Sequence, residues 1–453
     1  MRSIVRLMKR LKIKHWALVL LVLILTLHYG GVLLFMREKS FKEFQYPLVG
    51  DVSRYVGEMK RGEIPSKNPV YNHDYYISKH PKHKCLTEDE KQYHSLRVLY
   101  LVKSAVGHFD RREVIRKTWG MEKRFADVPI RTVFLLGSVP DDLTMQGKVE
   151  NEFQQFKDLV QGSFEDNYYN NSLKAAMGLR WAVDHCSRSR FYVFVDDDYY
   201  VSTRNLLRFL RNPLNYPGYL EEDVISFDED TNMFPRKGRK HRDTAEVLNN
   251  PDNVVLEHIL AEPGDTFINK TKVVGIEHKN GEFFKAGVEK QEGGKPDVES
   301  GTEMFDEEVG PARKLNQLID FDLPEDVKLF AGYVFPDSRP HRHRISKWFV
   351  PLEEYPYNRW PAYVTAGAYV LSREGLVDMY YTSYFTKLFR FDDIWLGLIA
   401  QKASIEPLHS SEFYFHRKVY SVRNYKYVVA SHGFSDSREL FRVWNQQREA
   451  GNA

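Results

Sequence analysis

Three short apolar runs, separated by stretches with helical patterning, constrain the fold of this chain more than any other feature. They are LRVLYLVKS (96–104), RTVFLLG (131–137) and FYVFVDD (191–197). The stretches between them, such as RREVIRKTWG and KVENEFQQFKDLV, have the apolar spacing of helices. Strands that alternate with helices form βαβ units, in which neighbouring strands run parallel. The pattern therefore predicts an α/β domain with a mainly parallel central sheet.

The third apolar run ends in three consecutive aspartates, Asp196, Asp197 and Asp198. Parallel sheets bind their ligands at the carboxyl ends of the strands, which is where these aspartates fall. Carboxylates repel one another and resist burial, so a positive charge is expected beside them. A D-x-D pair can coordinate Mg²⁺ or Mn²⁺ while the metal bridges two phosphates. The alternative, for three aspartates considered alone, is an exposed turn.

A second pair of carboxylates lies in LFRFDDIWLG, where Asp392 and Asp393 are surrounded by aromatic and apolar residues. Transfer of a group to a hydroxyl requires a base, and a carboxylate with a pKa raised by poor hydration suits that task. The alternative is that these aspartates cap the following helix, and one of them can do so while the other catalyses.

Histidines and arginines supply further candidates for binding a metal or an anion. His416 and His432 are the best placed histidines for a metal ligand, although isolated histidines more often have structural roles. Arg111, Arg112 and Arg116 could contact a diphosphate, whereas helix arginines usually face solvent.

The N-terminus carries a basic flank followed by the apolar run WALVLLVLILTLHYGGVLLF, residues 16–35. A run of this length is typical of a helix that crosses a bilayer. A cleaved signal peptide is the alternative, but the run is long, rich in Leu and Val, and lacks a clean small-x-small cleavage site. We predict a cytoplasmic tail over 1–15 and a single signal anchor over 16–35, with all later residues in the lumen.

The remaining chain divides by composition. Residues 36–93 are charged and lack sustained periodicity, which predicts a lumenal stem. Residues 94–220 and 327–447 form the predicted catalytic domain, and 221–326 is a low-complexity insertion, mostly disordered or loosely packed. The formal net charge of +3 gives no reason to expect nucleic acid as a partner.

Two cysteines and two sequons bear on the compartment. Cys85 and Cys186 could pair in an oxidising lumen, or remain two separate buried thiols. Asn170 and Asn269 lie in N-x-S/T sequons and are predicted glycosylation sites.

In their order along the chain, four motifs resemble the signature series of the beta-1,3-glycosyltransferases, glycosyltransferase family 31, most closely its Brainiac-type members. They are RREVIRKTWG, FVDDDYYVS, KWFVPLEEYPYNRWPAYVTAGAYVLS and FRFDDIWLG, and the resemblance extends over about residues 96–444. It implies a GT-A nucleotide-sugar-binding fold, an inverting single displacement, Mn²⁺ as cofactor, and a Golgi membrane enzyme that takes a UDP-sugar donor.

The resemblance also implies a role for individual residues. Asp198 and His432 are expected to bind the metal, Asp393 to act as the base, and Arg112, Arg116, Asp196, Asp197 and Asp392 to contact the donor. The chain departs from the family's EDV motif, which is DDI here, so the role of Asp392 is the least defined by the likeness.

Brainiac-type members transfer N-acetylglucosamine in β-1,3 linkage to the mannose of mannosyl-β-1,4-glucosylceramide, and the resemblance implies this reaction. The alternative is a β-1,3-galactosyltransferase that uses UDP-galactose on N-acetylglucosamine or N-acetylgalactosamine acceptors. From another class, an inactive lumenal binding protein would be expected to have lost one of the carboxylates, and this chain keeps all of them. The sequence leaves the oligomeric state open, a homo-oligomer included.

Overall fold

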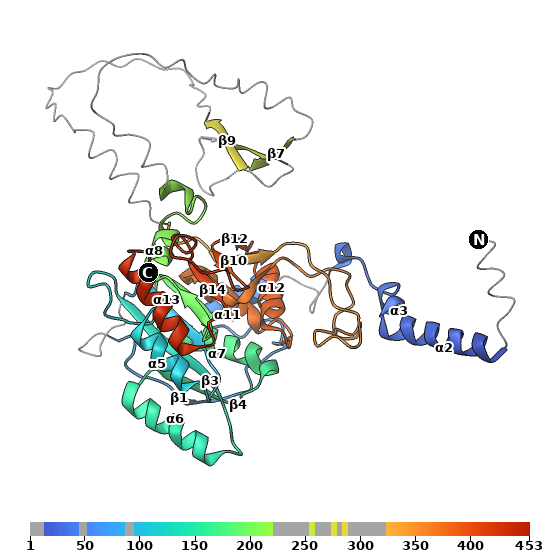
Figure 1. Ribbon diagram of the computed structural model, residues 1–453, viewed down its shortest axis with the longest axis horizontal. Helices are drawn as coiled ribbons and strands as arrows, with labels where there is room; N and C mark the ends of the chain where they lie inside the picture. Colours follow the sequence, from blue (N-terminus) through green and yellow to red (C-terminus); the bar gives the residue numbers. More distant parts are fainter. Residues whose placement is uncertain are drawn as a thin grey trace, which may run out of the picture. The chain divides into compact units, whose positions relative to one another are not determined.

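The computed structural model describes residues 13–44, 52–86, 95–220, 253–258, 273–278, 283–288 and 323–453. The chain forms two compact units, one built from Met1–Asp223 with Asn316–Ala453 and the other from Val224–Leu315. Figure 1 shows the first unit as a sheet with helices on both of its faces.

The central sheet of the first unit has the strand order β1-β4-β3-β2-β5-β11-β10-β12. Strands β4, β3, β2 and β5 pair in parallel, while β11 is antiparallel to both β5 and β10. The bounds are β1 Ile77–Lys79, β2 Val98–Lys103, β3 Ile130–Ser138, β4 Leu159–Glu165, β5 Phe191–Asp196, β10 Phe330–Phe335, β11 Tyr363–Ser372 and β12 Leu408–His409. The three predicted strands are confirmed as β2, β3 and β5, and they run parallel as expected.

Helices cover the sheet according to the alternation of side chains along its strands. Successive residues of a strand point to opposite faces, so the two faces of β2 have different partners. Leu99 and Leu101 pack in the core beneath α7 (Asn171–His185), α11 (Arg373–Ser383) and α12 (Asp392–Lys402). The opposite face, with Val98, Tyr100 and Val102, packs against α5, α6, α8 and α13. These span Phe109–Lys117, Leu143–Phe156, Thr203–Arg211 and Ser437–Glu449.

One predicted helical stretch, 148–160, is part helix and part strand. Helix α6 ends at Phe156, because Lys157 adopts a left-handed conformation with φ of 49° and terminates the helix. Strand β4 then begins at Leu159.

A small second sheet, with the order β13-β14-β6, lies after the aspartate motif. Its strands are β6 Tyr199–Val201, β13 Phe413–Tyr414 and β14 Ala430–His432. His432 pairs with Tyr199, so this sheet brings a histidine from the C-terminal part of the chain next to the aspartates.

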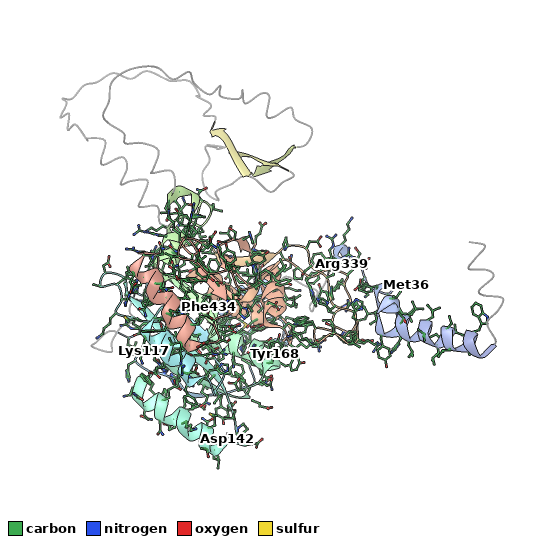
Figure 2. All side chains as sticks on the ribbon, viewed as in Figure 1. Met36, Lys117, Asp142, Tyr168, Arg339 and Phe434 are labelled. Atoms are coloured by element: carbon green, nitrogen blue, oxygen red, sulfur yellow. A yellow bond between two sulfur atoms is a disulfide. The ribbon has the colours of Figure 1, made fainter. Side chains whose placement is uncertain are left out.

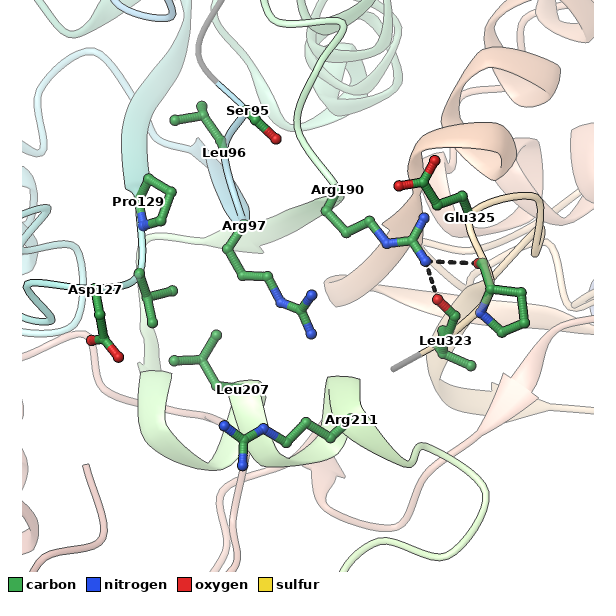
Figure 3. A pocket seen from close by; sticks show the side chains of 12 residues that line it. Ser95, Leu96, Arg97, Asp127, Pro129, Arg190, Leu207, Arg211, Leu323 and Glu325 are labelled. Carbon is green, nitrogen blue, oxygen red and sulfur yellow. Dashed lines mark hydrogen bonds between the residues drawn. The ribbon is translucent and has the colours of Figure 1, made fainter. Parts of the chain in front are cut away.

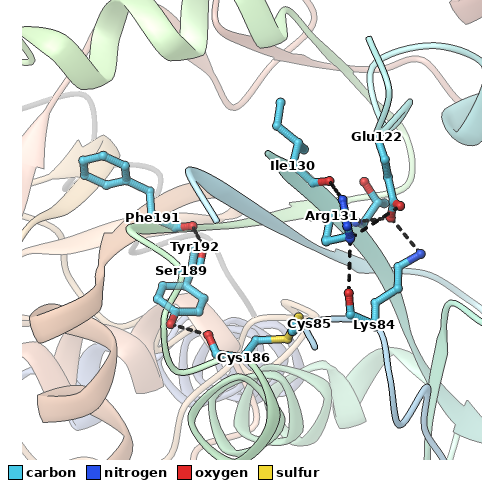
Figure 4. Close-up of a disulfide and its surroundings, with 10 residues drawn as sticks. Lys84, Cys85, Glu122, Ile130, Arg131, Cys186, Ser189, Phe191 and Tyr192 are labelled. Atoms are coloured by element: carbon cyan, nitrogen blue, oxygen red, sulfur yellow. Dashed lines mark hydrogen bonds and ion pairs between the residues drawn. A yellow bond between two sulfur atoms is a disulfide. The ribbon is translucent and has the colours of Figure 1, made fainter. Parts of the chain in front are cut away.

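Cys85 and Cys186 form a disulfide, so the paired alternative is what the structure shows (Figure 4). Their Cα atoms are 5.4 Å apart and the residues are separated by 101 positions. The bond joins the segment before β2 to the end of α7, and the hydroxyl of Tyr192 in β5 donates to the carbonyl oxygen of Cys186 at 2.8 Å.

At the N-terminus the apolar run is divided between two helices, α2 (Ile13–Tyr29) and α3 (Val32–Phe35). The helices are separated at Gly30 and Gly31, the second of which has a φ of 74°. Within the ranges described, no helix has both the length and the apolar character needed to cross a membrane.

The predicted stem contains more packed structure than expected. It includes η1 (Phe41–Glu43) and α4 (Val52–Lys60). Val52 and Val56 of α4 are buried against Phe385, so this helix packs inside the first unit, next to the end of α11, instead of forming an extended spacer.

Within the predicted insertion, the structure describes a three-stranded antiparallel sheet formed by β7 (Asn253–His258), β8 (Val273–His278) and β9 (Phe283–Val288). Regular strand pairing thus occurs in a segment for which we predicted little order. Most other residues of the predicted insertion, including the sequon at Asn269, lie outside the described residues.

Candidate active site

A cavity of about 640 Å³ lies at the carboxyl end of β5. Asp196, Asp392, Asp393 and His432 all line it, although they come from three motifs far apart in the sequence. The parallel strands place Asp196 at this edge of the sheet, the first turn of α12 supplies the other two carboxylates, and β14 supplies the histidine.

A second cavity, of about 670 Å³, lies at the opposite end of the parallel strands (Figure 3). Arg97, Arg190 and Arg211 line it, and Arg190 donates to the carbonyl oxygen of Pro324 at 2.7 Å. None of the site residues predicted from the sequence lines this cavity. The chemistry indicated by the motifs is therefore concentrated in the first cavity.

Lys103, the last residue of β2, links the two carboxylate motifs. Its Nζ lies 2.9 Å from Asp196 Oδ1 and 2.6 Å from Asp392 Oδ2, and its side chain is only 2% exposed. Burial alone would lower the pKa of Lys103, but the two carboxylates outweigh it and hold that pKa well above its ordinary value. Lys103 is thus a permanent cation that holds the end of β5 against the start of α12.

Asp196 has a shifted pKa mainly because its carboxylate is buried. Burial raises its pKa to about 7, Lys103 opposes the rise, and Asp392 and Asp198 add to it. A buried lysine thus supplies one of the positive charges expected beside the three adjacent aspartates.

Asp197 points into the protein instead of into the cavity. Its Oδ2 accepts hydrogen bonds from Ser104 Oγ at 2.6 Å and His108 Nδ1 at 2.8 Å, and its Oδ1 accepts from Arg111 at 2.9 Å. Burial would raise the pKa of Asp197, but these donors hold it below its usual range. The structure gives Asp197 a positioning role in the loop, which differs from the donor contact predicted for it.

Asp198 and His432 face each other, with His432 Nε2 3.3 Å from Asp198 Oδ2. The hydrogen bond to Asp198 raises the pKa of His432, and partial burial opposes that rise. The other histidine considered, His416, is exposed and does not line the cavity.

The Asp198–His432 pair fits a metal that binds together with a nucleotide. No set of three or more His, Cys, Asp or Glu side chains in the described ranges is arranged to hold a metal by itself. Mg²⁺ and similar cations usually take only one or two carboxylates from a protein and complete their coordination with substrate phosphates and water. One carboxylate and one imidazole beside an open cavity are a donor set of that kind.

Asp393 lies at the cavity wall in the first turn of α12. Its Oδ1 accepts a hydrogen bond from the backbone N–H of Ile394 at 2.8 Å. Burial and the neighbouring Asp392 raise the pKa of Asp393 to about 7. Neither aspartate is the N-cap of α12, which is Phe391, so the capping alternative does not account for them.

Arg112 and Arg116 do not reach the cavity. Arg112 is fully buried and donates to Glu152 at 2.8–3.1 Å, while Arg116 binds both Glu152 and Asp158 at 2.7–2.9 Å. This geometry corrects the prediction that Arg112 and Arg116 contact the sugar donor, because their guanidinium groups bind internal carboxylates instead. Arg111 is the member of the motif that approaches the aspartates.

Asn170 precedes α7, and its side-chain amide donates to the carbonyl oxygen of Glu165 at 2.8 Å. The serine of its sequon, Ser172, is buried and donates to the carbonyl oxygen of Phe389. Glycosylation at Asn170 remains a prediction.

Aromatic side chains form much of the remaining cavity wall. They are Tyr168, Tyr199, Phe335, Trp348, Trp360, Tyr363, Phe391 and Phe415. Aromatic faces beside a few fixed polar groups are typical of sites that bind small polar ligands such as sugars.

The sequence reasoning missed Lys103, Ser104 and His108. A signal for Lys103 was present, because a lysine that ends a fully apolar strand must be paired if it is buried. Ser104 and His108 carry no comparable signal, since their partner Asp197 is about ninety positions away.

The structure thus gathers strand-end aspartates, a facing histidine and a second carboxylate at one end of an α/β sheet, as expected from the glycosyltransferase resemblance of the motifs. Residues 110–232 and 309–411 match the family model described as Galactosyltransferase, and the chain belongs to this family, glycosyltransferase family 31. The unmatched residues 233–308 fall inside the predicted insertion.

Similarity to individual proteins supports the same conclusion. The chain is 34% identical to "Beta-1,3-galactosyltransferase brn" of Drosophila melanogaster, over 98% of this chain and 99% of that protein. It is 25% identical to the human "Beta-1,3-galactosyltransferase 1", over 83% of this chain and 80% of the relative. It is 22% identical to the mouse "Beta-1,3-galactosyltransferase 2", over 84% of this chain and 64% of the relative. The predicted family is confirmed, and with it the hexosyltransferase class.

Proposed function

We propose that this protein is an inverting, Mn²⁺-dependent β-1,3-N-acetylglucosaminyltransferase with a GT-A fold. Its donor is UDP-N-acetylglucosamine, and its acceptor is the mannose of mannosyl-β-1,4-glucosylceramide. The observation that carries the proposal is the convergence of Asp393, Asp196 and His432 on one cavity. The likeness to Brainiac-type sequences supports the choice of sugar and acceptor.

Asp393 is the base in this proposal. In a single displacement with inversion, the acceptor hydroxyl must lose its proton as it attacks the sugar. The Asp393 carboxylate faces the cavity, and a pKa raised toward neutrality makes it a better proton acceptor than an ordinary surface aspartate. The hydrogen bond from the Ile394 N–H fixes the orientation of the carboxylate.

Asp198 and His432 would hold the metal. When bound, Mn²⁺ supplies charge stabilisation for the diphosphate that leaves with UDP. The chain's own contribution at this end is positional: Lys103 binds Asp196 and Asp392, and Arg111 and His108 bind Asp197. The loop that carries the metal ligand is thereby fixed relative to the base.

The second candidate function is β-1,3-galactosyl transfer from UDP-galactose. It is favoured by the names of the three relatives described above, each of which is called a beta-1,3-galactosyltransferase. The same aspartates, histidine and base would serve either donor.

A panel of donors and acceptors tests the proposal. UDP-N-acetylglucosamine and UDP-galactose are each offered with mannosyl-glucosyl-lipid and with N-acetylglucosamine acceptors, with Mn²⁺ and with a chelator. We expect metal-dependent transfer of N-acetylglucosamine to mannose. Galactose transfer would replace the substrate assignment, and no transfer would support a binding protein.

Two variants test the mechanism. Asp393→Asn is expected to abolish transfer while leaving UDP binding intact. Asp142→Asn, which removes the N-capping carboxylate of α6 well away from the cavity, is the control and is expected to retain activity. An active Asp393→Asn enzyme would rule out the proposed base.

We also propose a Golgi membrane location with a lumenal catalytic unit. The Cys85–Cys186 disulfide supports an oxidising compartment, and the basic flank before the apolar run supports a cytoplasmic N-terminus. Protection of the catalytic unit from protease in sealed Golgi vesicles would be the expected result, and digestion without detergent would contradict it.

A further inference from the structure

The chain that follows helix α2 is attached directly to the wall of the active-site cavity. Arg344 N donates to the carbonyl oxygen of Tyr29 at 3.1 Å, and Lys39 N donates to the carbonyl oxygen of Pro356 at 2.8 Å. Asn358 N in turn donates to the carbonyl oxygen of Lys39 at 2.9 Å. The predicted spacer between the apolar helix and the catalytic unit is therefore absent at this point, since residues 29–39 pair with the loop 342–358.

A buried ion pair fixes this attachment. Arg342 is fully buried, and its Nε lies 2.7 Å from Oε1 of Glu38, whose side chain is 8% exposed. The same guanidinium donates to the carbonyl oxygens of Val350, Tyr355 and Tyr357 at 2.7–3.0 Å. A buried, fully bonded arginine of this kind holds its neighbours in a defined geometry.

Close packing at Gly31 also fixes the attachment. A Cβ placed on Gly31 would lie 2.2 Å from the carbonyl oxygen of Arg342, so a side chain there would force the two segments apart. The chain just after α2 thus has one tightly packed position against the loop.

The loop has the composition of a surface that meets lipid headgroups. Ile345 is 84% exposed and Trp348 is 46% exposed, and Met36 beside the attachment is 79% exposed. Exposed basic side chains surround them, namely Arg339, Arg344 and Lys347, with His341 and His343. Residues 339–348 contain no acidic residue, and Glu353 and Glu354 come later in the loop. Large apolar and aromatic side chains among cations are typical of segments that lie in the headgroup region of a bilayer.

The same loop lines the cavity that contains Asp393. Arg339, His341 and Trp348 belong to both the exposed surface and the cavity wall. Helix α2, to which the loop is tied, exposes apolar side chains along its described length, including Leu18, Leu21 and Leu25. Figure 2 shows Met36 and Arg339 on one side of the molecule and Asp142 at a different end.

We propose that residues 339–348, together with Met36, dock on the headgroup surface of a phospholipid bilayer and hold the mouth of the cavity beside it. A glycolipid in that bilayer could then present its terminal sugar to the cavity without leaving the membrane. This second step rests on the proposed function, whereas the docking itself does not.

A fluorescent probe tests the docking without reference to activity. Both cysteines of the chain are in the disulfide, so an added cysteine provides a single reactive thiol. Full-length Ile345→Cys is labelled with an environment-sensitive dye and placed in vesicles that contain lipids with a quencher. The control is Leu143→Cys, at a residue of matched exposure, 82%, on helix α6.

We expect the probe at position 345 to lose emission in phospholipid vesicles and the probe at 143 to keep it. Equal quenching at the two positions, or no quenching at 345, would overturn the proposal.

Transfer assays then test the consequence for the acceptor. The double variant Arg344→Glu, Ile345→Glu is expected to lose about tenfold in transfer to a mannosyl-glucosyl-lipid in phospholipid vesicles, because each substitution places a negative charge beside the lipid phosphates. Transfer to a water-soluble mannosyl-glucoside is expected to stay unchanged. The control, Leu143→Glu with Lys148→Glu on α6, should leave both rates unchanged. An equal loss on both acceptors would overturn the docking role.

A wild-type enzyme inactive on both acceptors would refute the proposed function alone, because the probe experiment still decides the docking.

Discussion

Replacement of Lys103 by methionine tests whether one buried cation holds the site together. The change keeps most of the side-chain volume but removes the charge that lies 2.9 Å from Asp196 and 2.6 Å from Asp392. Removing one partner of a buried ion pair typically costs about 3–5 kcal/mol, because the remaining charge is left uncompensated. The carboxylates of Asp196 and Asp392 are 34% and 16% exposed, so water can reach them in part. We therefore expect a loss at the lower end, about 3 kcal/mol of unfolding free energy.

The same substitution should impair catalysis beyond its effect on stability. Lys103 joins the end of β5 to the first turn of α12, which carries Asp393. A displacement of about 1 Å between reacting groups can cost about 100-fold in rate, and kcat is expected to fall by a factor of that order. Urea unfolding gives the stability, and turnover at a temperature where the variant is folded gives kcat.

Lys174→Met is the matched control for this experiment. Lys174 is also buried and forms an ion pair with Asp166 at 2.7 Å, but it does not bind the carboxylates of the cavity. It should lose stability to a similar degree and retain most of its kcat. The reasoning would be refuted by a Lys103→Met enzyme with a wild-type unfolding midpoint, or by one whose kcat falls no further than that of Lys174→Met.

Three further predictions concern the base, the metal ligand and the disulfide. Burial and Asp392 raise the pKa of Asp393 to about 7, so its basic form is lost as the pH falls through that value, and kcat should drop on the acid side. An acid limb of the pH profile near 4, about the ordinary pKa of an aspartate, would argue against this. His432→Ala should raise the Mn²⁺ concentration for half-maximal activity by at least about tenfold and leave the free energy of unfolding nearly unchanged. An unaltered Mn²⁺ titration would exclude His432 as a metal ligand. Cys186→Ser should lower the unfolding free energy by about 2–5 kcal/mol in non-reducing denaturation, and a variant as stable as the wild type would show that the pairing has no stabilising effect.

The parallel half of the sheet could be predicted because its strands are continuous apolar runs separated by helical spacing. Val98 to Lys103 is buried at every position, as expected for a strand covered on both faces. The antiparallel half could not be predicted in the same way. Strand β11 pairs with β5 across more than 170 positions of sequence, and apolar periodicity does not identify a partner at that distance.

The residues that gather at the cavity, Asp196, Asp392, Asp393 and His432, could be selected from the sequence because they lie in short motifs, while their chemical roles stay predictions. The arginine assignment failed for a physical reason. Sequence gives the spacing of Arg112 and Arg116 along a helix, but it does not show that Glu152 and Asp158 lie opposite and bind them. Lys103 shows the reverse situation, in which a single charge in an apolar run indicates a buried partner before that partner is known.

The Cys85–Cys186 disulfide has a practical consequence for proteolysis of this chain. The residues between the two cysteines include β2, β3 and β4, with the exposed turn near Leu143. A single cut in that turn would leave both fragments covalently joined. The nicked chain would migrate as one band without reductant and as two bands with it. The comparison of the two gels would therefore report the pairing of the cysteines and the accessibility of the turn in one experiment.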